Sequence, residues 1–250
     1  MTRDLTQDDL LDVVEREGTR AAAAAEGVDH DRPVPGCPGL TVGETARHLG
    51  SVYRMVVTWL RTGTRPSIWP RQPDEGQPVE DYLRDGLRSL LGELAAHPPS
   101  TPCETWHPQD GTYGFWRRRM AHESTVHRMD IESALSRDLT PVTDSLALDG
   151  IDEVLTLWFT HRLTDRGVAG TRHTTVSVRS GPRSWLATMD PWGTTSTETD
   201  TPGDARITGA PMEMYLWLWG RRPVYDRSVV QEGDFDAIAQ FWALLRLATK

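Results

Sequence analysis

The sequence predicts a two-domain α+β protein, with a four-helix bundle in residues 1–140 and a smaller α+β domain in residues 141–250. Three observations indicate this arrangement. The N-terminal part holds four amphipathic patterns at helical spacing, separated by connectors rich in Pro and Gly. From Pro141 onward, short runs rich in β-branched residues alternate with apolar helical segments. The length of 250 residues is also sufficient for two domains.

Four helices are expected in the N-terminal domain. The first covers residues 4–26, where leucines and valines stand among acids before an alanine run. The second covers residues 41–62, because it begins with Thr-Val-Gly-Glu, which has the form of a capping box. The third starts at Val79 and stops at a His-Pro-Pro sequence, and the fourth covers about 113–137. The core of such a bundle commonly holds metal ligands that project from facing helices.

The C-terminal domain is expected to mix helices with short strands. A helix is predicted over residues 146–163, and a hairpin over 172–180 and 183–190 with its turn at Gly181-Pro182. The Thr-rich stretch 194–204 is interpreted as a polar connector. The remaining expected elements are the strands ARIT (205–208) and SVVQ (228–231) and the helices 210–219 and 235–248.

Composition limits the possible partners. A net charge of −9 argues against nucleic acid and anionic membranes, because an acidic surface attracts neither. No apolar run approaches the roughly 18 to 20 residues that cross a bilayer, and the acidic N-terminus does not resemble a signal peptide. A cytoplasmic protein that binds small molecules is therefore expected. Cys37 and Cys103 are far apart, so a metal site here is expected to use nitrogen and oxygen ligands.

The segment 116–130 holds the strongest candidate for a functional site. Glu123 and His127 are one helical turn apart and lie in an apolar stripe, where an ionised carboxylate needs a compensating partner. His48, on the second predicted helix, can face them across the bundle. Two histidines and a glutamate with one open position are typical of catalytic zinc. Alternatively, Glu123 forms a buried ion pair with an arginine and both histidines are hydrogen-bonded core residues, which composition alone favours. Helix geometry points His122 away from His127, and His122 is expected at the surface.

Three segments carry a resemblance to a known family: CPGLTVGETARHLGSV, MAHESTVHRMDIE and ITGAPMEMYLWLWGRRP. Together they resemble the mycothiol-dependent maleylpyruvate isomerase family of actinobacteria, over nearly the whole chain. The resemblance implies a DinB-like four-helix bundle followed by a sterol-carrier-like C-terminal domain.

The resemblance also implies a metal and a thiol. His48, Glu123 and His127 are the implied ligands of zinc or another divalent metal, with water or a thiol in the open position. In the family, zinc binds the sulfur of mycothiol and lowers its pKa, and the thiolate adds to an electrophilic double bond. The implied activity is that of a mycothiol-dependent isomerase or S-transferase acting on a small-molecule electrophile.

Four further residues have implied or possible roles at this site. Arg221 or Arg222 is implied to bind a substrate carboxylate, although two arginines after a glycine can equally cap a helix. Asp130 can hydrogen-bond the ligand His127, and Arg128 can hold the bundle to the second domain. Asp130 and Arg128 can also form a surface salt bridge of little consequence.

Two other function classes stay open from the sequence. The metal can instead activate water in a hydrolase. The chain can also be a non-catalytic protein whose C-terminal domain binds an apolar small molecule. Added thiol distinguishes the first alternative from the implied enzyme, because hydrolysis does not need it.

Overall fold

The computed structural model describes residues 3–249. It divides into a helical unit of residues 5–140 and a second unit that contains the described residues from Pro141 onward. The second unit combines helices with a five-stranded sheet. The predicted two-domain α+β fold class is confirmed. No helix within residues 3–249 is long and apolar enough to span a membrane.

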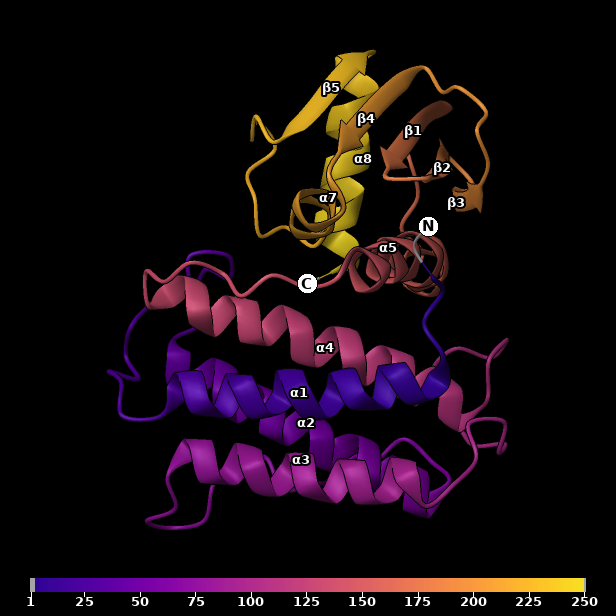
Figure 1. Cartoon of the computed structure of the whole chain (residues 1–250). Helices are drawn as coiled ribbons and strands as arrows, with labels where there is room; N and C mark the ends of the chain where they lie inside the picture. Colours follow the sequence, from indigo (N-terminus) through magenta and orange to yellow (C-terminus); the bar gives the residue numbers. More distant parts are fainter. Residues whose placement is uncertain (1–2, 250) are drawn as a thin grey trace. The chain divides into compact units, whose positions relative to one another are not determined.

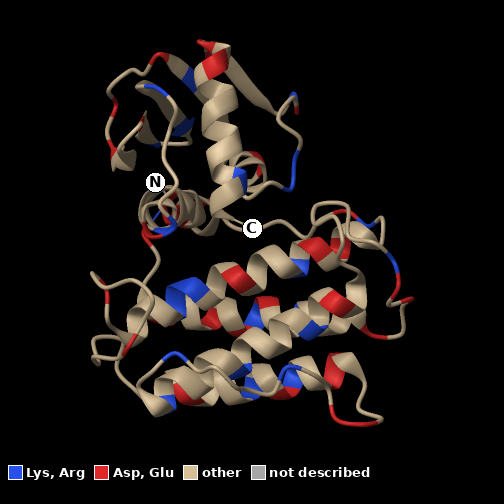
Figure 2. Cartoon of the chain, turned by 180° about the vertical axis from the view of Figure 1, so that it is seen from behind, with Lys and Arg blue, Asp and Glu red and all other residues tan. Residues whose placement is uncertain are grey.

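Four long helices build the helical unit, as the amphipathic patterns predicted. In Figure 1 they pack side by side, with α1 against α4 and α3, and α2 against α3 and α4. Their inner faces form an apolar core in which Leu49, Tyr53, Leu83 and Trp116 are almost completely buried. Acidic and basic residues are interspersed along these helices (Figure 2). The bounds are α1 Gln7–Ala25, α2 Val42–Thr62, α3 Val79–Ala95 and α4 Tyr113–Ala134.

The predicted capping box at the start of α2 is present. The Thr41 side chain accepts a hydrogen bond from the Glu44 amide, and the Glu44 carboxylate accepts one from the Thr41 amide. This reciprocal pair fixes the first residue of α2. His48 therefore lies about two turns inside the helix.

Helix α4 is buried on nearly every side, although it is rich in charged residues. Its buried polar side chains include Arg117, Arg119, His127, Arg128 and Asp130. Because buried charges are costly without partners, α4 must carry its own compensating pairs. These pairs determine what the helix can do chemically.

The second unit begins with a long helical segment and continues into the sheet. The helix predicted over 146–163 is present as α5 (Asp144–Glu153), the π-helix η1 (Val154–Arg162) and α6 (Leu163–Asp165). The strand order is β3-β2-β1-β4-β5, in which β1 and β4 are parallel and the other neighbours antiparallel. The remaining elements are β1 Thr174–Ser180, β2 Arg183–Asp190, β3 Gly193–Glu198, β4 Ala205–Gly209, α7 Pro211–Leu218, β5 Val229–Gly233 and α8 Phe235–Ala248.

The interpretation of residues 194–204 as a connector is wrong for its first half. Residues Gly193–Glu198 form the edge strand β3, which pairs antiparallel with β2 from Asp190↔Gly193 to Trp185↔Glu198. Threonine is β-branched and favours strands, and one face of an edge strand stays exposed, so a polar sequence is compatible with it. Composition alone therefore did not distinguish this strand from a loop.

Candidate metal centre

Helices α2 and α4 bring the three predicted ligand residues together. Glu123 Oε1 lies 3.3 Å from His48 Nε2 and 3.3 Å from His127 Nε2. One candidate ligand atom from each residue lies within 4.8 Å of the other two. Helix α4 contributes Glu123 and His127 one turn apart, and α2 contributes His48 from across the core. The side chain of His48 is 44% exposed, whereas those of Glu123 and His127 are 15% and 11% exposed.

The atoms of His127 and Glu123 that face away from the cluster also have hydrogen-bond partners. Asp130 Oδ2 lies 3.0 Å from His127 Nδ1, which leaves His127 Nε2 directed at Glu123. Arg119 Nη2 donates to Glu123 Oε2 at 2.7 Å. The Cys37 thiol lies 3.6 Å from Asp130 Oδ2, so the connector after α1 reaches this site. Such contacts with a ligand's outer atoms fix its orientation and tautomer.

Burial and hydrogen bonding have opposite effects on the pKa values of Glu123 and His127. Burial disfavours the charged form of Glu123, but hydrogen bonds from His127 and His48 and the charges of His127 and Arg119 hold the pKa of this carboxyl well below its usual range. Burial likewise lowers the pKa of His127, but the bonds to Asp130 and Glu123 outweigh it and raise this pKa to about 9. In the metal-free protein the site is therefore a carboxylate beside an imidazolium.

The donor set fits a divalent metal ion. Bonds of about 2.0 to 2.1 Å in tetrahedral geometry keep neighbouring ligand atoms about 3.3 to 3.4 Å apart. The separations of Glu123 Oε1 from His48 Nε2 and His127 Nε2 have this length. Two imidazole nitrogens and one carboxylate oxygen suit zinc and other divalent transition metals. Three protein ligands leave a further position for water or substrate.

The alternative interpretation of Glu123 is also partly realised. Glu123 does form a buried ion pair with an arginine, namely Arg119. This pair occupies Oε2 and leaves Oε1 facing the histidines. The ion pair and the metal site are therefore compatible with each other.

Arg128 lies in a buried ionic network of the helical unit. Its guanidinium contacts Glu17 and Glu132 and donates to the carbonyl oxygen of Thr140. None of these three partners belongs to the His48, Glu123 and His127 group. The predicted role of Arg128 in holding the bundle to the second domain stays a prediction.

Arg221 and Arg222 follow α7 in the second unit. Arg221 Nη1 donates to the carbonyl oxygen of Trp219, and Arg222 Nε lies 3.3 Å from Glu213 Oε2. The first contact is typical of a basic residue at a helix C-terminus, and the second is an ion pair with the first turn of α7. The predicted binding of a substrate carboxylate by either arginine stays a prediction.

The expectation that His122 is a surface residue is wrong, because the structure buries it completely. The helical angle correctly indicated that it points away from His127, but α4 has almost no solvent-facing side for it to occupy. His122 is not one of the three clustered candidate ligands.

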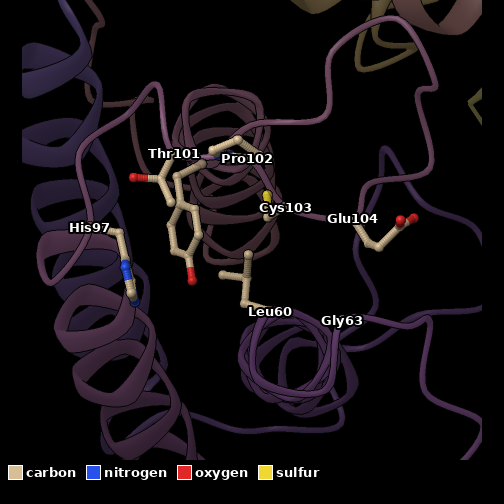
Figure 3. A pocket seen from close by; sticks show the side chains of 8 residues that line it. Leu60, Gly63, His97, Thr101, Pro102, Cys103 and Glu104 are labelled. Carbon is tan, nitrogen blue, oxygen red and sulfur yellow. The ribbon is translucent and has the colours of Figure 1, made fainter.

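A separate pocket of about 490 Å³ lies near the C-terminal end of α2, and its lining includes Leu60, His97, Cys103 and Tyr113 (Figure 3). Twelve residues of α2 separate Leu60 from His48, which is about 18 Å of helix. Burial, with the nearby charges of acidic residues, raises the pKa of Cys103 to about 11. This thiol is therefore protonated at neutral pH and is a poor nucleophile.

Arg119 and Cys37 were missed in the sequence. Arg119 precedes Glu123 by four residues, and this i,i+4 spacing is the signal that could have singled it out from its arginine neighbours. Cys37 gives no comparable local signal, because the contact with Asp130 joins positions 93 residues apart.

Comparisons with known proteins agree with this architecture. The family model described as the mycothiol maleylpyruvate isomerase N-terminal domain matches residues 11–132, and the MDMPI C-terminal domain matches residues 145–240. No curated protein matches the chain. The crystal structure of the mycothiol-dependent maleylpyruvate isomerase has a TM-score of 0.60 and 12% identity, covering 92% of this chain and 95% of that chain. The structure of a histidine-to-alanine mutant of the mycothiol-dependent maleylpyruvate isomerase has a TM-score of 0.60 and 11% identity, with the same coverage of both chains. At these identities the likeness to solved structures shows a shared fold.

Proposed function

Because the chain belongs to the mycothiol-dependent maleylpyruvate isomerase family, we propose that it is a metal- and mycothiol-dependent enzyme that adds a thiolate to an electrophilic small molecule. The observation that carries this proposal is the convergence of His48, Glu123 and His127 at ligand spacing. The reaction is either cis-trans isomerisation or thiol transfer.

The three residues would hold zinc or a similar divalent ion. When bound, such an ion lowers the pKa of a thiol and so supplies a nucleophile at neutral pH. Asp130 accepts a hydrogen bond from the Nδ1–H of His127. This bond favours the tautomer whose Nε2 is free to bind the metal. His127 must give up its second proton for its Nε2 to bind a metal.

The chemistry of the substrate follows from thiolate addition. Addition to an activated carbon-carbon double bond converts it to a single bond, about which the substrate can rotate. Elimination of the thiolate then restores the double bond as the trans isomer. If the substrate instead has a leaving group, the same attack transfers the thiol. Arg221 or Arg222 is the proposed partner for a substrate carboxylate.

A turnover assay with maleylpyruvate tests this proposal. The purified protein is assayed with and without mycothiol, before and after removal of metal by a chelator. We expect turnover only when both are present. Turnover that is independent of added thiol would instead favour the hydrolase alternative, because hydrolysis needs only metal-activated water.

A matched variant separates site effects from general damage to the bundle. His97→Ala removes a half-exposed histidine that packs on Tyr113, the first residue of α4. Fourteen residues of α4 separate Tyr113 from His127, or about 21 Å. His97→Ala should retain turnover, whereas His48→Ala should abolish it.

A further inference from the structure

Arg119 contacts one carboxylate oxygen of Glu123, and the two histidines face the other. Its Nη2 is 2.7 Å from Oε2, while Oε1 is the oxygen that lies 3.3 Å from both His48 and His127. The Arg119 side chain is 3% exposed, so little water competes for this contact. A charge-assisted bond of this length is among the stronger hydrogen bonds in proteins.

This division matters for the number of ligand atoms that a metal ion receives. A carboxylate can bind an ion through one oxygen or both. With both oxygens of Glu123, the protein would supply four ligand atoms, and water or a thiol could bind only as a fifth ligand. With one oxygen, the protein supplies three, and an exchangeable position stays open for water or a thiol.

We propose that Arg119 is a positioning residue that limits Glu123 to one metal-binding oxygen and so keeps the thiol-binding position open. This inference rests on the proposed function, because it concerns how the same site is kept open. The candidate ligand that Arg119 contacts is Glu123, and Arg119 acts through that carboxylate.

If Arg119 only compensates charge, its loss should leave the coordination of the metal unchanged. If Arg119 positions Glu123, its loss should change that coordination. Arg119→Lys keeps the positive charge and one hydrogen-bond donor, so it should preserve both roles. Arg119→Met removes the donor and frees Oε2. Arg119→Gln removes the charge, and its side chain is too short to hold Oε2 as Arg119 does, so it replaces the Met variant if that protein does not fold.

The test uses Co²⁺ as the only probe, added to the metal-free full-length protein. The visible absorption of Co²⁺ is intense in four-coordinate sites and weaker when a fifth ligand binds. We expect Arg119→Met to lower this intensity by about twofold or more as Glu123 becomes bidentate. Its Co²⁺ affinity should fall by no more than about 10- to 100-fold, because all three ligand residues remain and only an outer contact is lost. Arg119→Lys should give the wild-type spectrum.

Arg118→Met is the matched control. Arg118 is five positions before Glu123, about 140° around the helix, so it cannot reach the same carboxylate. This variant should also give the wild-type spectrum. Wild-type intensity in both Arg119→Met and Arg119→Gln would overturn the positioning role while leaving the proposed function intact. A wild-type protein that binds no Co²⁺ would contradict the proposed function, and the inference with it.

Discussion

Replacing Arg128 tests whether α4 depends on its buried ionic network. Arg128 is completely buried, and Glu17 Oε2 lies 2.8 Å from both its Nε and its Nη2. Its Nη1 lies 2.6 Å from Glu132 Oε2. Arg128→Met therefore removes the central cation from two carboxylates whose side chains are 1% and 10% exposed.

The expected cost of Arg128→Met is about 3 kcal/mol. Removing one partner of a buried ion pair typically costs about 3 to 5 kcal/mol. The lower end applies because Glu17 keeps Arg16 and Arg20, and Glu132 keeps the amide and hydroxyl of Thr140. At a slope of about 2 kcal/mol per molar urea, the unfolding midpoint should fall by about 1.5 M.

Urea unfolding followed by far-ultraviolet circular dichroism measures this shift, because the bundle contributes long helices to that signal. Arg16→Met and Arg20→Met are matched controls, since both arginines contact the same Glu17 but are 41% and 42% exposed. Each control should cost less than about 1 kcal/mol. If Arg128→Met costs no more than these controls, the reasoning about burial is refuted. Metal content should not change, because Arg128 contacts Glu17, Glu132 and Thr140 and these are not candidate ligands.

Two further predictions concern His127 and its partner. Asp130→Asn should weaken zinc binding by about 10- to 100-fold, because it loses the charged acceptor for His127 Nδ1, and equal affinity in a competition titration would contradict this role. In the metal-free protein, burial lowers the pKa of His127, but Asp130 and Glu123 outweigh burial and raise it from 6.5 to about 9. The stability that this shift contributes, about 3 kcal/mol, is fully present below pH 6.5 and is lost as the pH rises through 9. The free energy of unfolding of chelator-treated protein, measured across this pH range, should show the loss. The decrease should be smaller in His127→Gln.

The sequence predicted the ligand group because α4 has a regular period. Glu123 and His127 are one turn apart on α4, and the Thr-x-x-Glu cap fixed where His48 lies on α2. These are local patterns that depend on helix geometry alone. The family resemblance then favoured a metal site over a structural ion pair, a choice that local patterns could not make and that stays a prediction.

The features that were missed depend on tertiary structure. His122 was expected at the surface because one helix was assumed to have a solvent face, whereas α4 is enclosed on nearly all sides. Strand β3 is defined by its pairing with β2, and its Thr-rich sequence alone resembles a loop. The proximity of Cys37 to Asp130 results from the path of a connector after α1. No local pattern encodes such long-range contacts.

The metal content of the purified protein tests the central claim most directly. Bound metal is measured by elemental analysis in wild type, His48→Ala, Glu123→Ala and His127→Ala, with His97→Ala as the control from the other end of the bundle. We predict bound zinc or a similar divalent ion in the wild-type and control proteins and its loss in each ligand variant. Unchanged metal content in all three ligand variants would contradict the assignment.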